Sequence, residues 1–335
     1  MNPLAARLRE RIAAEGPIPF SAFMESALYD ARDGFYARGP RLGPGGAFTT
    51  APTAAPFLAH ALSSELRAVW DRLGRPEPFT LAEVGPGDGS LAAQLASELA
   101  DLPLELVLCE RAGGMLERAR ARVPGARAVP LAQLTGVRGA ILANEVHDAC
   151  PAHRLRWPDE LLVGVGPDGR FAFVPGPPAG SLGDALRAAG VVPADGAVYD
   201  VSPAQSELQR VLARALDRGS LIVLDYGEAG PARYERRVPR LRSYVGGMPG
   251  GDVLAAPGTQ DLTVDVDFGA VRAAGEREGL RTTLDRGQPE WLLEHGAEDA
   301  IARLPRHDTA RLWLEALSDP HGSGAAFRVL VQERE

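Results

Sequence analysis

The sequence predicts an α/β protein built on a doubly wound, mostly parallel sheet. From Phe79 onward, short apolar segments alternate with segments of helical apolar spacing. This order implies parallel strands joined by right-handed crossovers. A turn with three alternating glycines follows the first apolar segment, and an acid ends the second. These features are typical of a sheet that holds a nucleotide at the carboxyl ends of its strands.

Apolar runs and turn residues set the order of elements in the predicted core. We expect strands at residues 80–84, 104–110, 126–129, 139–144 and 220–227, helices at 90–100, 114–122 and 202–216, and a closing antiparallel edge strand at 325–332. Ser202 and Gln205 have the spacing of a capping box, with Pro203 at the first helical position.

The chain before this core, residues 1–75, is predicted to be an N-terminal helical and lid segment. Residues 4–14, 19–28 and 56–73 have helical spacing, with Ser21 as a candidate cap of the second helix. Residues 29–56 combine glycines with aromatic side chains in a loop that is long for a compact domain. We expect this loop to form a lid over the site, and the alternative is a poorly ordered connector.

Two stretches interrupt the alternation within the core, residues 76–335. Residues 152–200 are predicted to be an inserted β-hairpin subdomain, which turns at 167–169 and gains a strand near 196–201. Residues 228–258 are a Gly/Pro/Arg-rich loop, a type of segment that is more often solvated surface than a site.

Composition excludes several classes of protein. Of 335 residues, 45% are apolar and 24% are charged, with a net charge of −8, as in an ordinary globular protein. All 36 basic residues are arginines dispersed along the chain, so we expect no nucleic-acid partner. Cys109 and Cys150 have neither disulfide-framework nor metal-site spacing, so no metal is expected. We find no transmembrane run or targeting peptide, and we therefore expect a cytoplasmic protein without a membrane span. A homodimer is compatible with the sequence, which does not decide the oligomeric state.

The glycine turn and the following acid predict a cofactor site. Gly85, Gly87 and Gly89 allow a sharp turn and a close approach to a ligand, whereas the alternative is a structural turn. Glu110 lies 21 residues after Gly89, where a carboxylate can accept both hydroxyls of an adenosine ribose.

The details of this turn favour S-adenosylmethionine over a dinucleotide. The spacing is G-x-G-x-G, and Ser90 stands where a dinucleotide site has its third glycine. Glu83 precedes the turn, where it would repel a diphosphate but attract the ammonium of an amino-acid moiety. The alternative for Glu83 is a solvated or ion-paired acid at a strand end. An NAD-dependent dehydrogenase is the least favoured hypothesis.

The fourth predicted strand ends in candidate acceptor-site residues. Asn144, Glu145 and Asp148 supply one amide and two carboxylates, and carboxylates match a guanidinium bidentately. A lone histidine such as His147 is more often structural than a general base. Asp225 and Tyr226 either line the same crevice or form a strand-end turn.

Several motifs together resemble one known family over nearly the whole chain. They are Gly34-Phe-Tyr36, Gly45-Gly-Ala-Phe-Thr-Thr-Ala-Pro52, Glu83-Val-Gly-Pro-Gly-Asp-Gly89, Asn144-Glu-Val-His-Asp-Ala-Cys-Pro151, Asp225-Tyr-Gly227 and Pro257-Gly-Thr-Gln-Asp-Leu-Thr263. In order and spacing they resemble the MidA-type family, which includes the mitochondrial protein arginine methyltransferase that assists assembly of respiratory complex I. The resemblance implies a class I, Rossmann-like methyltransferase fold, S-adenosyl-L-methionine as cofactor and a protein arginine as acceptor.

The resemblance also assigns site residues. It implies that the donor is held by Glu83, Gly85, Pro86, Gly87 and Glu110, with Thr50 and Pro52 closing over it, and that Glu145 and Asp148 face the acceptor. The sequence departs from the family pattern at Ala47, Thr53, Asp88 and Asp265. Two alternatives to a protein arginine methyltransferase therefore stay open: a methyltransferase for a different, small-molecule acceptor, and a cofactor-binding assembly or scaffold protein without turnover.

Overall fold

The computed structural model describes residues 2–40, 57–231, 234, 240–304, 308–319 and 323–335. Its centre is an eight-stranded sheet in the order β14-β15-β9-β4-β1-β2-β3, with β13 also paired to β9. The parallel part comprises β1 (Phe79–Val84), β2 (Leu104–Cys109), β3 (Arg127–Ala128), β4 (Val137–Asn144), β9 (Leu216–Glu228) and β13 (Val266–Asp267). This sheet confirms the predicted doubly wound α/β fold.

The last two strands of the sheet differ in part from the prediction. β15 (Phe327–Arg334) is antiparallel to β9 as expected, but it is not the edge strand. β14 (Arg281–Gly287), which the sequence analysis did not predict, pairs with β15 on its outer side. The sequence of β14 is polar and rich in arginine, so it lacks the apolar run by which the other strands were predicted. An edge strand needs little apolar surface.

Helices cover both faces of this sheet. They are α4 (Phe57–Arg72), α5 (Ser90–Glu98), α6 (Gly113–Arg122), α8 (Pro203–Ala215), α10 (Phe268–Arg277), α11 (Gln288–Glu294), α12 (Ala297–Ala302) and α13 (Asp308–Ser318). Successive β1 residues alternate between two apolar cores: Leu81 packs on the side of α4, α5 and α11 to α13, whereas Ala82 packs on the side of α8 and α10. Helix α4, which the sequence analysis groups with the N-terminal segment, thus packs on the sheet.

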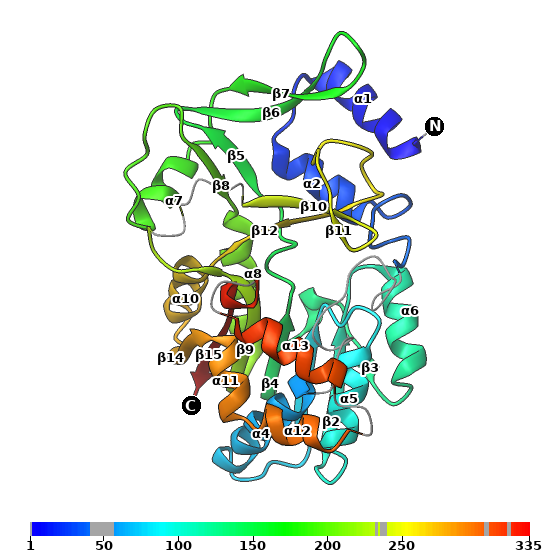
Figure 1. Ribbon diagram of the computed structural model, residues 1–335, viewed down its shortest axis with the longest axis vertical. Helices are drawn as coiled ribbons and strands as arrows, with labels where there is room; N and C mark the ends of the chain where they lie inside the picture. Colours follow the sequence, from blue (N-terminus) through cyan, green and yellow to red (C-terminus); the bar gives the residue numbers. More distant parts are fainter. Residues whose placement is uncertain (1, 41–56, 232–233, 235–239, 305–307, 320–322) are drawn as a thin grey trace.

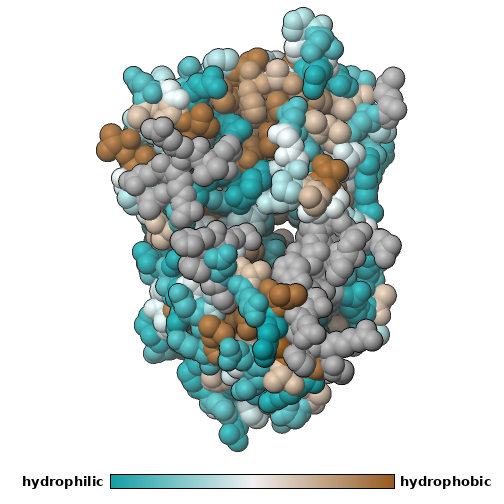
Figure 2. All heavy atoms as spheres, viewed as in Figure 1, coloured by the Kyte–Doolittle hydropathy of each residue, from teal (hydrophilic) through white to brown (hydrophobic). Residues whose placement is uncertain are grey.

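A second part of the molecule is assembled from three distant segments (Figure 1). It contains α1 (Pro3–Glu15) and α2 (Phe20–Tyr29), a four-stranded sheet of β5 (His153–Arg156), β6 (Asp159–Val165), β7 (Phe171–Gly176) and β8 (Val198–Val201) with α7 (Leu182–Ala188), and a three-stranded sheet of β10 (Leu241–Val245), β11 (Met248–Pro249) and β12 (Asp261–Val264). One apolar cluster unites them, with Phe20 and Phe23 from α2, Val163 from β6 and Leu262 from β12. Figure 2 shows a recess between this part and the sheet.

Two details predicted for helix starts are wrong. Helix α8 begins at Pro203 as expected, but Ser202 makes no capping bond, because its hydroxyl donates to the Pro151 carbonyl at 2.8 Å. The Gln205 side chain donates to the His147 carbonyl at 3.1 Å, so tertiary contacts replace the capping box. Helix α2 begins at Phe20, which places Ser21 inside the helix rather than at its cap.

The segment 228–258 is not simply a loop. It contains β10 and β11, which pair with each other and with β12. Short, polar strands of this kind carry little apolar periodicity, so their partner β12 rather than their own sequence defines them.

Gly89 sits where the glycine turn meets α6. Its φ is +79°, a left-handed conformation, and a Cβ built there would lie 2.8 Å from the Cα of Ala119. The glycine therefore permits close packing of α5 against α6.

We predict that Gly89→Ala lowers the free energy of unfolding by about 1–3 kcal/mol, because a side chain adds strain and a backbone clash. Gly113→Ala is the matched control, since a Cβ at Gly113 would meet nothing within 4 Å. Urea unfolding of both variants measures the difference, and equal stabilities would contradict the packing role.

Candidate active site

A cavity of about 930 Å³ lies at the carboxyl ends of the central strands. Its floor comes from the ends of β1, β2 and β4, the residues that follow them, and Tyr226 near the end of β9. Its other wall comes from α2, residues 29–36, β10 and β12. The predicted site residues that line it are Glu83, Gly85, Pro86, Gly87, Glu110, Asn144, Glu145 and Asp148. Gly89 does not line the cavity, and Thr50 and Pro52, like Ala47 and Thr53, lie outside the described residues.

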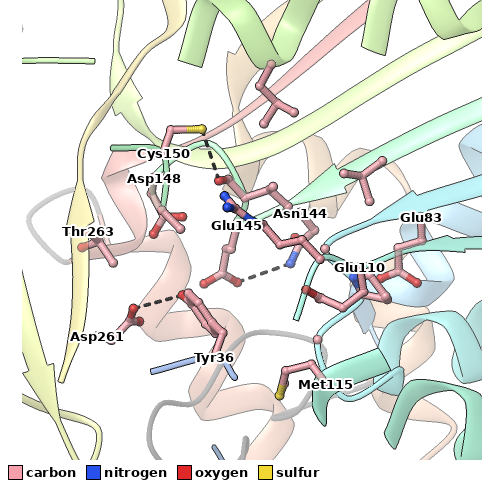
Figure 3. Close-up of a pocket in the computed structure, with 18 of the residues that line it drawn as sticks. Tyr36, Glu83, Glu110, Met115, Asn144, Glu145, Asp148, Cys150, Asp261 and Thr263 are labelled. Carbon is pink, nitrogen blue, oxygen red and sulfur yellow. Dashed lines mark hydrogen bonds between the residues drawn. The ribbon is translucent and has the colours of Figure 1, made fainter. Parts of the chain in front are cut away.

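Five of the seven acids that line the cavity are labelled in Figure 3, and they fall into two groups. Glu83 and Glu110 lie on one side of the view, Asp148 and Asp261 on the other, and Glu145 between them. Both groups line the same cavity, so a ligand at one group lies within reach of a ligand at the other.

Glu83, at the end of β1, is 3% exposed, and its Oε2 has no hydrogen-bond partner. Burial, together with the charges of Asp88 and Glu110, raises the pKa of Glu83 to about 8. An ion-paired acid at a strand end, the alternative interpretation, does not describe this environment. A buried carboxyl without a partner is suited to a ligand that brings a cationic donor.

Glu110 follows β2 and is held by the backbone. Its Oε1 accepts the N–H of Ala112 at 2.8 Å, which orients the carboxyl at the cavity wall. Burial raises the pKa of Glu110, while backbone N–H groups that include that of Gly87 lower it.

The departure from the family pattern at Asp88 is explained by the contacts of this side chain. It accepts hydrogen bonds from the backbone N–H of Ser90 at 3.0 Å and from the Ser90 hydroxyl at 2.6 Å. Its other oxygen lies 3.0 Å from Arg122 of α6. This departure from the family pattern thus ties the glycine turn to α6.

Glu145 is the first residue after β4, and its backbone is unusual. Its φ is +52°, a left-handed conformation that is strained for a residue other than glycine and is typical of functional sites. Its N–H donates to the Leu224 carbonyl at 2.8 Å, which fixes this conformation. Burial and the charge of Asp148 raise the pKa of Glu145 to about 8.

Asp148 and Tyr226 form a hydrogen-bonded pair. The Tyr226 hydroxyl donates to Asp148 Oδ2 at 2.5 Å, and both residues line the cavity. Burial raises the pKa of Asp148 to about 6, although this hydrogen bond and the charge of Arg242 lower it.

Asp225 does not line the cavity. Fully buried, it accepts the backbone N–H groups of His147 at 3.0 Å, Asp148 at 3.2 Å and Tyr226 at 2.9 Å. Each of the two interpretations of this strand end therefore applies to one residue. Tyr226 lines the cavity, whereas Asp225 stabilises the loop after β4.

His147 lies behind the site. It is fully buried, it does not line the cavity, and its Nε2 lies 3.2 Å from Gln209 Oε1. Burial lowers the pKa of His147 to about 4. This position agrees with a structural role.

Sequence reasoning missed the residues of the opposite wall. Tyr36, Asp261 and Thr263 line the cavity, and the Tyr36 hydroxyl donates to Asp261 Oδ1 at 3.0 Å. All three belong to motifs that carried the family resemblance, which was the available signal, but no role had been assigned to them.

Asp265, another departure from the family pattern, lies in an ion-pair cluster. It contacts Arg240 at 2.6 Å and also pairs with Arg242. The Arg242 guanidinium lies 4.9 Å from the ring centre of Tyr226. Asp265 thus holds Arg242, which itself lines the cavity, against the ring of Tyr226.

Within the described ranges, no group of three or more His, Cys, Asp or Glu residues could hold a metal ion. In the same part of the chain, every helix is too short or too polar to cross a bilayer.

The buried acids make stability depend on pH in the ligand-free protein. Glu145 in the folded state has its pKa raised from 4.5 to about 8, so its protonated form is favoured by folding. The folded state therefore binds more protons than the unfolded state, and the stability from this carboxyl is lost as pH rises through the folded pKa.

We predict that the free energy of unfolding of the ligand-free protein falls from about pH 6.5 to about pH 8, and that Glu145→Gln makes this fall smaller. Urea unfolding at both pH values measures it. Glu10→Gln, an exposed change on α1, is the control. A fall of equal size in Glu145→Gln and the wild type would contradict the assignment.

Known proteins are similar to this chain over most of its length. The family model described as "Putative S-adenosyl-L-methionine-dependent methyltransferase" matches residues 61–284. A crystal structure of a Burkholderia thailandensis protein bound to S-adenosyl-homocysteine is 28% identical, with a TM-score of 0.88, and the match covers 99% of this chain and 92% of that one.

Two curated relatives carry specific names. The Drosophila melanogaster "Protein arginine methyltransferase NDUFAF7 homolog, mitochondrial" is 26% identical, over 98% of this chain and 84% of that protein. The Mus musculus "Protein arginine methyltransferase NDUFAF7, mitochondrial" is 28% identical, over 81% of this chain and 69% of that protein. Their mitochondrial location contradicts the predicted cytoplasmic one, because composition is a weak guide to compartment.

The family model spans well over half of the chain, and the structural match extends over nearly all of it. Both confirm the resemblance to the MidA-type family, the class I methyltransferase fold and the choice of cofactor over NAD. The chain belongs to the S-adenosyl-L-methionine-dependent methyltransferases and uses S-adenosyl-L-methionine as its cofactor.

Proposed function

We propose that this methyltransferase transfers the methyl group to the guanidinium of a protein arginine. The curated relatives are named protein arginine methyltransferases, which supports a protein substrate. The observation that carries the proposal is that Asp148, which is buried, and Glu145, which is partly buried, line the same cavity as Glu83 and Glu110, without an ion pair to any described residue. A cationic acceptor would supply the missing counter-charge.

The donor end fits S-adenosyl-L-methionine. Glu83, with its unpartnered Oε2, would hold the ammonium, and Glu110 would accept the ribose hydroxyls. Gly85, Pro86 and Gly87 would follow the ligand backbone at the cavity wall. Thr50 and Pro52 remain predicted donor contacts.

The acceptor end fits a guanidinium. Glu145 and Asp148 offer carboxylates to its planar N–H groups, and bidentate pairing would fix its orientation. Asn144 Nδ2 lies 3.5 Å from Glu145 Oε1, and this amide would help to position the carboxylate.

The same residues suit the proton transfer. The bound cofactor supplies an electrophilic methyl group on a positively charged sulfur. Methylation of a guanidinium nitrogen breaks the carbon–sulfur bond, forms a carbon–nitrogen bond and releases one proton from that nitrogen. A bound cation would favour the carboxylate form of Glu145, and this carboxylate can take the proton. Positioning in a buried cavity supplies the rest of the rate enhancement.

We predict that Glu110→Ala weakens donor binding by about 1–3 kcal/mol if its carboxylate holds the ribose. Calorimetric titration with S-adenosyl-L-methionine measures this. Glu105→Ala, on the strand that precedes Glu110 but outside the cavity lining, is the control. Unchanged affinity in Glu110→Ala would remove this residue from the donor site.

We predict that Glu145→Gln lowers methyl transfer to arginine peptides about 100-fold or more and leaves donor affinity nearly unchanged. Labelled S-adenosyl-L-methionine and protein or peptide substrates provide the assay, and Glu117→Gln on the exposed side of α6 is the control. Label that reaches only small molecules would contradict the arginine acceptor. Donor binding without any transfer would favour the scaffold alternative.

A further inference from the structure

The wall of the cavity that faces Glu145 comes from strand β12. Asp261 and Thr263 are two residues apart on this strand, so their side chains project from the same side. Both line the cavity, and they are only 4% and 3% exposed. Figure 3 shows them on the same side of the cavity as Asp148.

Thr263 lacks an internal partner. Its Oγ1 is buried and makes no hydrogen bond within the part of the chain that the structure describes. A buried hydroxyl without a partner is destabilising unless a ligand or water completes it. Because Thr263 belongs to the lining of the cavity, a ligand there lies next to this residue.

Asp261 has one side-chain partner, the hydroxyl of Tyr36, and no ion pair to a described residue. Burial and the charge of Asp148 raise the pKa of Asp261 to about 7. The environment of Asp261 thus resembles that of Glu145, and both carboxyls gain from a cation between them.

The number of donors on a guanidinium supports a second set of acceptors. An arginine side chain carries five N–H donors. Glu145 and Asp148 cannot satisfy all of them freely, because Asp148 Oδ2 already accepts the Tyr226 hydroxyl and Glu145 Oε1 lies near Asn144. Buried donors left unsatisfied would weaken binding.

We propose that Asp261 and Thr263 complete the acceptor subsite on the side of Asp148, across from Glu145, and that this subsite takes an alkylguanidinium. The proposal rests on the proposed function. Tyr36 acts as a positioning residue, because its hydroxyl orients Asp261.

One structural consequence concerns substrate choice. The donor half of the cavity is built from the ends of β1 and β2, whereas this wall is built from β12 and from the chain after α2. The second part of the molecule therefore contributes to the choice of acceptor, together with Glu145 and Asp148 in the loop after β4.

The test is binding of propylguanidine to the full chain saturated with S-adenosyl-homocysteine, measured by calorimetry. We expect Asp261→Asn to weaken it about tenfold or more and Thr263→Val severalfold, with affinity for S-adenosyl-homocysteine unchanged. Ser243→Ala is the matched control, because Ser243 Oγ is also buried and unpartnered but does not line the cavity. Thermal unfolding of each variant verifies that it is folded.

The outcomes separate the two proposals. If propylguanidine does not bind the wild type, or if both β12 variants bind it like Ser243→Ala, the subsite is wrong. If propylguanidine binds and requires Asp261, but the wild type transfers no methyl group to arginine peptides, the subsite stands and the proposed function fails.

Discussion

The site depends on one buried carboxylate, Asp225. Its oxygens accept backbone N–H groups from both the loop after β4 and the end of β9. These bonds hold Asp148 and Tyr226 next to each other, so that the tyrosine hydroxyl can donate to Asp148. Burial, together with the charges of Asp148 and Glu145, raises the pKa of Asp225 well above its ordinary value, which shows how unfavourable this environment is for a charge. The acidic loop is thus positioned by a group that never meets the ligand.

The cavity brings together four carboxyls that form no ion pair with a described residue, although Arg242 also belongs to its lining. Glu83, Glu145, Asp148 and Asp261 all have raised pKa values, and burial is the largest cause for each. Surface acids of the same chain, such as Asp101 beside Arg67, pair with arginines instead. Ligands that bring positive charge would relieve this desolvation, because the cofactor carries an ammonium and a sulfonium and a guanidinium acceptor is itself a cation. These carboxyls therefore lower the stability of the ligand-free protein, and binding of cationic ligands would offset this cost.

Sequence reasoning found the half of the site that lies on the sheet. Glu83, Glu110 and Glu145 each lie at or just after the end of an apolar run. The rule that ligands bind at the carboxyl ends of parallel strands was therefore sufficient to predict them as site residues. Asp261 and Tyr36 escaped it, because they are 225 positions apart and meet only through packing of α2 and β12 in one apolar cluster. One local pattern gave a wrong prediction because a tertiary contact replaced the local one. Gln205 has capping-box spacing, but its side chain donates to the His147 carbonyl in the loop after β4.

By itself the sequence determined the alternating strands and helices, the glycine turn and the acids at the strand ends, because periodicity and turn chemistry are local properties of the chain. The tertiary structure decided which of these residues share a cavity and which only support it. It moved Gly89 from the ligand to the packing of α6, placed His147 and Asp225 behind the site, and brought Asp261 and Thr263 opposite Glu145. These differences arise from desolvation and close packing, which depend on neighbours that are distant in the sequence.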